Sequence, residues 1–161
     1  MMNRTPDDTL RAYERLLRRK EYEKAYRYLE NLLKEFPDDE DLLENIIGLS
    51  LYSLNRLDLA KHWLSQIIKV RTFLPDYLEL SHLEATQGNI NKAKQYLTTC
   101  RELIRPFPRV KQKKRFEDSC DEIQRIIALR TSQETNTKQS TPRSTMPLPT
   151  AEKEIKNESP A

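Results

Sequence analysis

Three ten-residue segments of this chain match one another, and their spacing limits what the chain can fold into. The segments are 20–29, 55–64 and 88–97, and each has an apolar residue third, alanine sixth, an aromatic residue ninth and leucine tenth. Successive copies of the shared alanine lie 35 and 33 residues apart, at Ala25, Ala60 and Ala93. A fixed period of about 34 is typical of arrays of helix pairs, in which each pair buries its apolar face only against its neighbours. The period therefore predicts an all-α fold, an α-solenoid of three helix pairs.

Apolar residues recur at helical spacing between these landmarks, and turn-forming residues separate the helices. Pro37 ends the second helix, because proline disfavours helical backbone in the residue before it. Asp38 and Asp39 are placed to cap the third helix, and Thr5 to cap the first. The expected helices cover about residues 6–19, 22–35, 40–54, 57–70, 75–87 and 90–104. They group into repeats at about 6–39, 41–73 and 74–107.

A seventh helix is expected over about 109–130. Its apolar residues form one stripe and its other face is charged, as in a capping helix that closes a repeat array; the stripe is Phe116, Cys120, Ile123 and Ile127. The segment 131–161 holds six threonines, four serines and four prolines, and no aromatic residue. It lacks the apolar surface that would offset the entropy of ordering. The sequence therefore predicts one domain over 1–130 and a disordered tail over 131–161.

The composition argues against several classes of function. A formal charge of +3 is too small to predict nucleic-acid binding, and two glycines leave no glycine-rich phosphate loop. Neither His62 nor His82 has partners at metal-ligand spacing, and no nucleophile motif is present. We therefore expect no catalytic residue, cofactor or metal. Cys100 and Cys120 are expected to pack in the interior.

The N-terminal residues and the longest apolar stretch of the sequence predict the cellular location. The N-terminal residues lack the apolar stretch of a secretory signal. The longest apolar stretch, 42–54, is too short and too polar to span a bilayer. The expected location is the cytoplasm, with no membrane insertion.

The three segments resemble the tetratricopeptide repeat, which implies a right-handed α-solenoid, and the likeness covers about residues 6–107. That family has a small residue midway along the first helix, glycine or alanine at the turn, alanine early in the second helix and proline after it. The matching positions here are the three shared alanines, Gly48, Gly88 and Pro37. The resemblance implies that Gly48 lets two helices approach closely, at a cost of ~1 kcal/mol in helix propensity. Tyr13 and Ser81 depart from the pattern at the small positions of the first and third repeats.

In that family the first helices line a concave groove that binds a protein segment. The resemblance implies a mainly apolar groove here, and an exposed apolar strip of that size usually marks a binding site. The positions carried over are Leu10, Glu14, Leu17, Arg18, Leu42, Asn45, Leu49, Tyr52, Leu78, His82 and Ala85. The alternative is that some of them pack against the terminal helices. The expected function is a non-catalytic adaptor that binds an extended or helical protein segment. Whether the chain forms a homo-oligomer is left open by the sequence.

A second resemblance is to the small three-repeat chaperones of bacterial type III secretion translocators. These hold an extended apolar client segment, and the chain length, repeat number and apolar groove agree with that function. Those proteins usually carry a longer N-terminal dimerising segment, which this chain lacks before its first repeat. One repeat subtype grips peptide carboxylates, but the residues at the corresponding positions cannot donate to a carboxylate as required: Leu10, Glu14, Ile46, Pro75 and Glu79.

The run 101–115 carries seven basic residues and one acidic residue, Glu102. Such a run can contact an acidic partner, a phosphate or a membrane surface. The alternative, which we favour from sequence, is a solvated helix junction balanced by the acidic residues of 117–122. Aromatic residues in and beside the run are too few for a nucleic-acid stacking platform.

Overall fold

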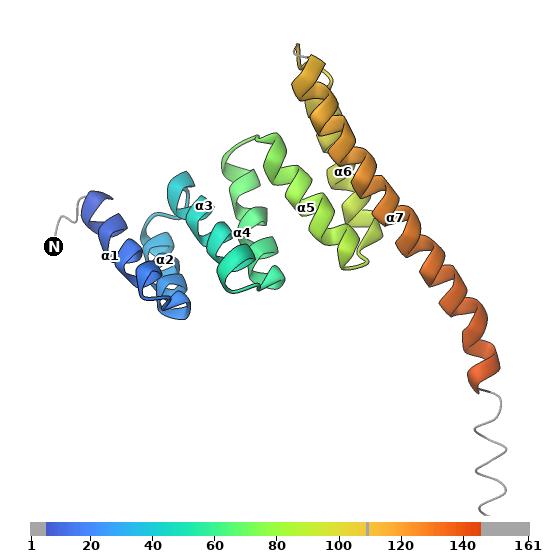
Figure 1. The fold of residues 1–161 in the computed structure, drawn as a ribbon, viewed down its shortest axis with the longest axis horizontal. Coiled ribbons are helices and arrows are strands. Elements are labelled where there is room, and N and C mark those ends of the chain that lie inside the picture. The colour runs from blue at the N-terminus through green and yellow to red at the C-terminus, as the bar shows by residue number, and fades with distance from the viewer. Residues whose placement is uncertain (1–5, 109, 146–161) are drawn as a thin grey trace, which may run out of the picture.

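A computed structural model describes residues 6–108 and 110–145, and all of its regular elements are helices (Figure 1). The all-helical fold class is therefore confirmed for these residues. The elements are α1 (Pro6–Arg18), α2 (Tyr22–Glu35), α3 (Glu40–Gly48), η1 (Leu49–Ser53), α4 (Leu57–Val70), α5 (Leu74–Thr86), α6 (Ile90–Ile104) and α7 (Val110–Thr145).

The helices follow one another in an elongated row (Figure 1). α1, α3, α5 and α7 begin at one edge of the row, and α2, α4 and α6 return toward that edge. Within the described residues, close backbone approaches join only elements that are adjacent in the chain or separated by one other element. α7 packs against both α5 and α6 and then projects beyond the rest of the molecule.

The first residue of each matching segment has a left-handed backbone. The φ angles are 58° at Lys20, 50° at Asn55 and 84° at Gly88. At each turn the amide of the next residue donates to a carbonyl of the preceding helix, at 2.8–3.0 Å. Left-handed residues commonly end helices in this way, since the reversed backbone lets the last carbonyls find donors. The sequence repeat is thus also a repeat of turn geometry.

The three shared alanines are fully buried, and the leucines four residues after them are almost fully buried.

The core has two parts. The N-terminal cluster joins α1, α2, α3, η1 and α4 with Leu80 and Leu83 of α5. The C-terminal cluster joins Leu74 and Ala85 of α5 with α6 and α7. α5 is therefore the element that connects the two clusters.

Polar side chains are buried along α5, where the two clusters meet. The hydroxyl of Ser81 donates to the carbonyl of Ala93 at 2.8 Å, and both residues are fully buried. This bond lies where α5 crosses the shared alanine of α6, so a small residue at position 81 allows close packing. Glu84 is 2% exposed and forms an ion pair with Lys61 of α4 at 2.5 Å.

The third predicted helix differs from the structure in its last turn. Residues 40–54 were expected to be one α-helix, but from Leu49 to Ser53 the backbone is π-helical. The amide of Leu54 bonds the carbonyl of Leu49 at 2.9 Å, and the buried Ser50 hydroxyl bonds the carbonyl of Ile46 at 2.7 Å. A serine that bonds back to the preceding turn bends a helix. The predicted cap is confirmed, since Asp39 accepts from the amide of Leu42 at 3.0 Å.

The expected packing at Gly48 is wrong. A Cβ atom built on Gly48 would have no atom within 4 Å beyond its own helix and chain neighbours. Its backbone is ordinary right-handed helix, with φ −59° and ψ −43°. No helix of the chain therefore uses the missing side chain for close approach. Gly88, by contrast, has a φ in the left-handed region, which glycine adopts at no steric cost, although Lys20 and Asn55 adopt that region at the equivalent turns.

The two glycines make a matched pair for a stability test. We expect Gly48→Ala to raise the free energy of unfolding by about 0.5–1 kcal/mol, because it removes a helix-propensity cost at a site with room. Gly88→Ala should lower it by about 1 kcal/mol, because an L side chain is strained at positive φ. Urea denaturation followed by circular dichroism measures both. Destabilisation by Gly48→Ala would show that a helix does pack there.

The C-terminal boundary also differs from the prediction. The expected capping helix ended at residue 130, and 131–161 was expected to be disordered, but α7 continues to Thr145. The hydroxyls of Thr131 and Thr135 donate to the carbonyls four residues earlier, at 2.8 and 3.0 Å. The hydroxyls of these two threonines are thus satisfied by the helix itself. The rest of the predicted tail, 146–161, and the predicted cap Thr5 lie outside the described residues.

Candidate functional site

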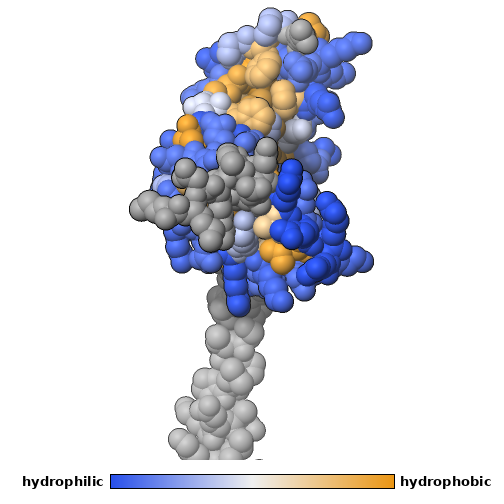
Figure 2. Space-filling model, turned by 90° about the vertical axis from the view of Figure 1, so that its left-hand side faces the viewer, coloured by the Kyte–Doolittle hydropathy of each residue, from blue (hydrophilic) through white to orange (hydrophobic). Residues whose placement is uncertain are grey.

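The structure divides the predicted groove residues into three groups. Those exposed to solvent are Leu10, Glu14, Arg18, Tyr52 and His82. Those half-buried are Leu17, Asn45 and Leu78. Those buried are Leu42, Leu49 and Ala85. Seen from the α1 end, the surface is mostly hydrophilic with separate apolar patches (Figure 2).

The three buried residues correct the predicted groove. Leu42 and Leu49 belong to the N-terminal cluster, and Ala85 to the C-terminal cluster. Their side chains are used by the chain's own core, so they cannot present an apolar surface to a partner. Helical periodicity alone could not separate a core-facing position from a groove-facing one here. The π turn adds to the error, because it rotates the residues after Gly48 relative to a regular α-helix.

A narrower surface remains on the second repeat, formed by Asn45, Gly48 and Tyr52, which we call the Tyr52 strip. These residues are three and four positions apart, so they follow one face of α3 into η1. Tyr52 is 84% exposed, the highest value among the exposed large apolar side chains described. The Asn45 amide donates to the carbonyl of Asp41 at 2.8 Å. Gly48 leaves an open notch between the two side chains.

The position of Tyr52 in the strip depends on the π-helical backbone of η1. Single π turns inside helices are uncommon and occur frequently at functional sites. Here the turn places a largely exposed tyrosine immediately before the left-handed Asn55 turn. The sequence signalled Tyr52 and Asn45 through the repeat resemblance, but it gave no signal for the π turn.

Arg71 and the acidic side chains around it form a cluster, the Arg71 cluster, where α3, α4 and α5 approach one another. Arg71 forms ion pairs with Asp76 at 2.9 Å, with Glu40 at 3.8 Å and, more closely, with Glu44. Its guanidinium also lies 4.7 Å from the centre of the Phe73 ring. Hydrogen bonding to Asp76 raises the pKa of Arg71 above its ordinary value, and bonding to Glu44 adds to this effect. Sequence reasoning missed this cluster, whose members are brought together only by the fold.

The two cysteines meet across the interface of α6 and α7. Both are fully buried and reduced. The hydrogen bond to Cys120, together with burial, raises the pKa of the Cys100 thiol. A thiol with a raised pKa is a poor nucleophile, because the thiolate is the reactive form. Both side chains are fully buried in the C-terminal cluster, so they pack in the interior as expected from sequence, although their contact was not predicted.

One of the two histidines, His62, lies in a small group of aromatic side chains. His62 packs edge-on against Trp63 with ring centres 4.8 Å apart, and the Trp63 indole donates to the Tyr26 hydroxyl at 2.9 Å. Across residues 6–108 and 110–145, no cluster of three or more potential metal ligands is found. None of the helices described there combines the length and the apolar character needed to cross a bilayer.

Comparison with known proteins does not identify the chain. No protein-family model matches it, and no curated protein matches it significantly.

Proposed function

We propose that the chain is a helical-repeat protein of the tetratricopeptide type that binds a segment of a partner protein, without catalysis, along the Tyr52 strip. Three features support the repeat assignment. The matching segments begin with the same left-handed turn, their alanines are fully buried, and contacts between helices are local along the chain. These are the properties expected of repeats that stack on their neighbours. The solenoid arrangement and its hand are part of this proposal.

The open notch at Gly48 is the observation that carries the binding proposal. A glycine in a helix costs ~1 kcal/mol relative to alanine. Nothing within the described chain approaches Gly48 closely enough to make use of the missing side chain. The close approach that would justify a glycine is therefore assigned to a bound partner. Tyr52 and Asn45, on either side, supply an aromatic surface and an amide.

The chemistry of the strip indicates what kind of segment fits. Tyr52 offers apolar ring surface, and burying it against a partner side chain would contribute ~1.5–3 kcal/mol. The amide and the phenol give directional hydrogen bonds beside it. A partner segment with one apolar anchor and polar flanks matches this surface. The secretion-chaperone alternative has no such support, because three of the predicted groove's apolar residues are buried.

A photo-crosslinking experiment tests this proposal. A benzoyl-phenylalanine placed at Tyr52 should capture a defined partner from native lysate, because its ring would lie against the bound segment. The same group at Phe36, which is exposed in the loop between α2 and α3, is the matched control. Gly48→Leu adds a side chain at a position where a Cβ atom has room, so it should abolish the crosslink while preserving the helical circular dichroism spectrum. Equal capture at both sites, or capture that survives Gly48→Leu, would contradict the proposal.

A further inference from the structure

The turn between α6 and α7 concentrates positive charge at one extremity of the molecule. Segment 101–115 contains seven basic residues and one acidic residue, whereas the whole chain has a formal charge of +3. The rest of the chain is therefore net negative. In Figure 1 this turn reaches further out than the turns joining the earlier repeats. The basic residues there that are described and exposed are Arg101, Arg105, Lys111, Lys114 and Arg115.

The placement of these charges does not serve helix stability. The N-terminus of a helix carries partial positive charge, so acidic residues stabilise it and basic ones do not. Four helices follow this rule with acidic residues in the first turn, namely α2, α3, α4 and α5. α6 and α7 have none, and in α7 Lys111, Lys113 and Lys114 stand in the first turns. An anionic partner would relieve this repulsion.

The acidic residues that follow pair with only part of the basic run. Asp121 lies 3.5 Å from Arg101, and Glu122 pairs with Arg125. Within the described part of the chain, no ion pair involves Lys111, Lys114 or Arg115. The charges of Lys111, Lys114 and Arg115 are thus available to a partner, while the balanced junction that the sequence favours stays the alternative.

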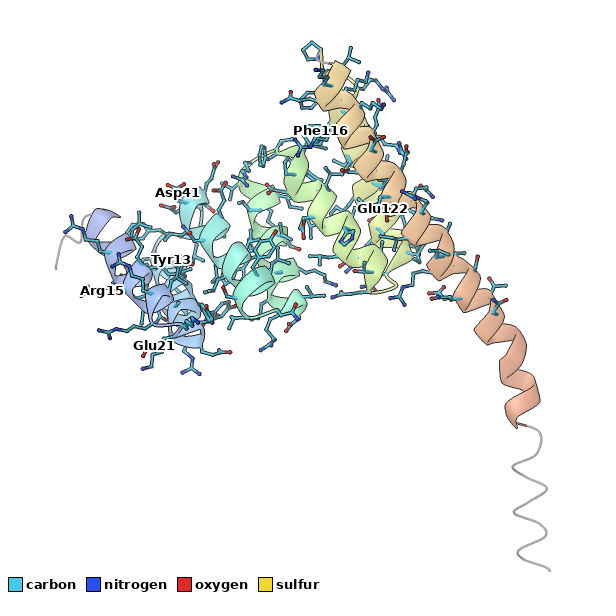
Figure 3. All side chains as sticks on the ribbon, viewed as in Figure 1. Tyr13, Arg15, Glu21, Asp41, Phe116 and Glu122 are labelled. Atoms are coloured by element: carbon cyan, nitrogen blue, oxygen red, sulfur yellow. The ribbon has the colours of Figure 1, made fainter. Side chains whose placement is uncertain are left out.

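An apolar tip lies among these charges. Val110, the first residue of α7, is 81% exposed, and Pro106 and Pro108 beside it are exposed too. Phe107 and Phe116 hold the turn against the body, with ring centres 5.5 Å apart. Phe116 lies on the side of α7 that faces the other helices (Figure 3). These half-buried rings are not free to stack on nucleic-acid bases, which disfavours a nucleic-acid partner.

We propose that the α6–α7 turn binds the surface of an anionic lipid bilayer. Val110 and the adjacent prolines enter the headgroup region, and Arg105, Lys111, Lys114 and Arg115 surround them with positive charge. Exposed apolar groups framed by basic side chains are the combination that lies in a membrane interface, where burial of apolar area and attraction to anionic lipids act together. A purely acidic protein or a phosphate would use the charges but would leave Val110 without a role. This proposal is independent of the Tyr52 strip.

Vesicle sedimentation with the full chain tests the electrostatic part. The protein should bind phosphatidylcholine vesicles that contain phosphatidylserine, and not vesicles of phosphatidylcholine alone. The triple variant Lys111→Glu, Lys114→Glu, Arg115→Glu should bind roughly 100-fold more weakly, because each basic residue near the surface contributes about a fivefold factor. Raising the salt concentration from about 0.1 M to about 1 M should also release the protein, because it shortens the Debye length.

A second triple reversal at the opposite end of the molecule is the matched control. Arg11, Arg19 and Arg27 are exposed, and none forms an ion pair with a described residue. Reversing them changes the net charge by the same amount, and vesicle binding should stay as in the wild type. Arg15, a neighbour on α1, lies far from Phe116 in Figure 3, which illustrates the separation. If both triple variants lost vesicle binding equally, the effect would depend only on the net charge of the protein, and the proposal would be overturned.

A fluorescent label tests whether the apolar tip enters the bilayer. The native cysteines are buried, so Val110→Cys can be labelled selectively with an environment-sensitive dye. Its emission should shift to the blue on anionic vesicles. The control Leu129→Cys labels another exposed apolar position of α7, 64% exposed, and should not shift. Equal emission shifts at Val110→Cys and Leu129→Cys would overturn the lipid assignment. Binding of the protein to polyglutamate but not to anionic vesicles would overturn it too.

Discussion

Lys61→Met is expected to lower the free energy of unfolding by about 3 kcal/mol, because it leaves a buried carboxylate without its partner. Glu84 is almost fully buried on α5, and its Oε2 atom accepts no hydrogen bond from a described residue. The Lys61 ammonium reaches Glu84 Oε1 from α4 and also donates to Gln87 at 2.8 Å. Partial exposure of Lys61 places the loss at the lower end of the range for broken buried pairs. Urea denaturation measures it.

Two further variants show whether the loss comes from the stranded charge. Lys61→Met combined with Glu84→Gln removes the charge and should recover much of the stability, because replacing both partners of a buried pair is far less costly than removing one. Lys69→Met changes an exposed lysine of the same helix and should have an effect within about 0.5 kcal/mol. A double variant as unstable as the single one would mean that packing, not charge, explains the loss.

Ile123→Ala is expected to cost about 2–5 kcal/mol, because it opens a cavity in the C-terminal cluster. Ile123 lies between Cys120 and Ile127 on the buried stripe of α7. Since contacts are local along the chain, this loss should unfold α6 and α7 before the N-terminal cluster. Hydrogen exchange at intermediate urea should show early loss of protection there, with α2 and α4 still protected.

Leu129→Ala provides the comparison on the same helix. Leu129 is exposed, so its truncation should leave stability nearly unchanged. Simultaneous loss of protection in all helices of the Ile123→Ala variant would show instead that the two clusters unfold as one cooperative unit.

The repeat pattern predicted the helices well where burial and turn chemistry agree. The bounds of α2, α4 and α6 follow from the turn residues and from the leucines buried after each shared alanine. These features depend on interactions within one repeat, so a sequence period reveals them. The stripe of the last helix was also predicted, since Cys120, Ile123 and Ile127 are buried and Phe116 is half-buried.

The prediction failed where several elements act together. Gly48 was assigned to a helix crossing because of its repeat position, but the close crossing is found at Ser81 and Ala93. The predicted groove included residues that the chain's own core uses, namely Leu42 and Ala85 on regular helices and Leu49 at the start of the π turn. The Arg71 cluster joins residues from three elements and has no linear signature. The proposed Tyr52 strip was therefore only partly visible in the sequence.

The division of the core into two clusters has a consequence for how the chain is made. All the buried residues of the N-terminal cluster are present once Leu83 has been added, and the half-buried Tyr96 of α6 packs against it later. A chain emerging from the ribosome can therefore bury this part of its apolar surface while α6 and α7 are still being synthesised, as domains generally fold from the N-terminus during translation. The nascent α5 would then offer Leu74 and Ala85 as a ready template for the helices that arrive last.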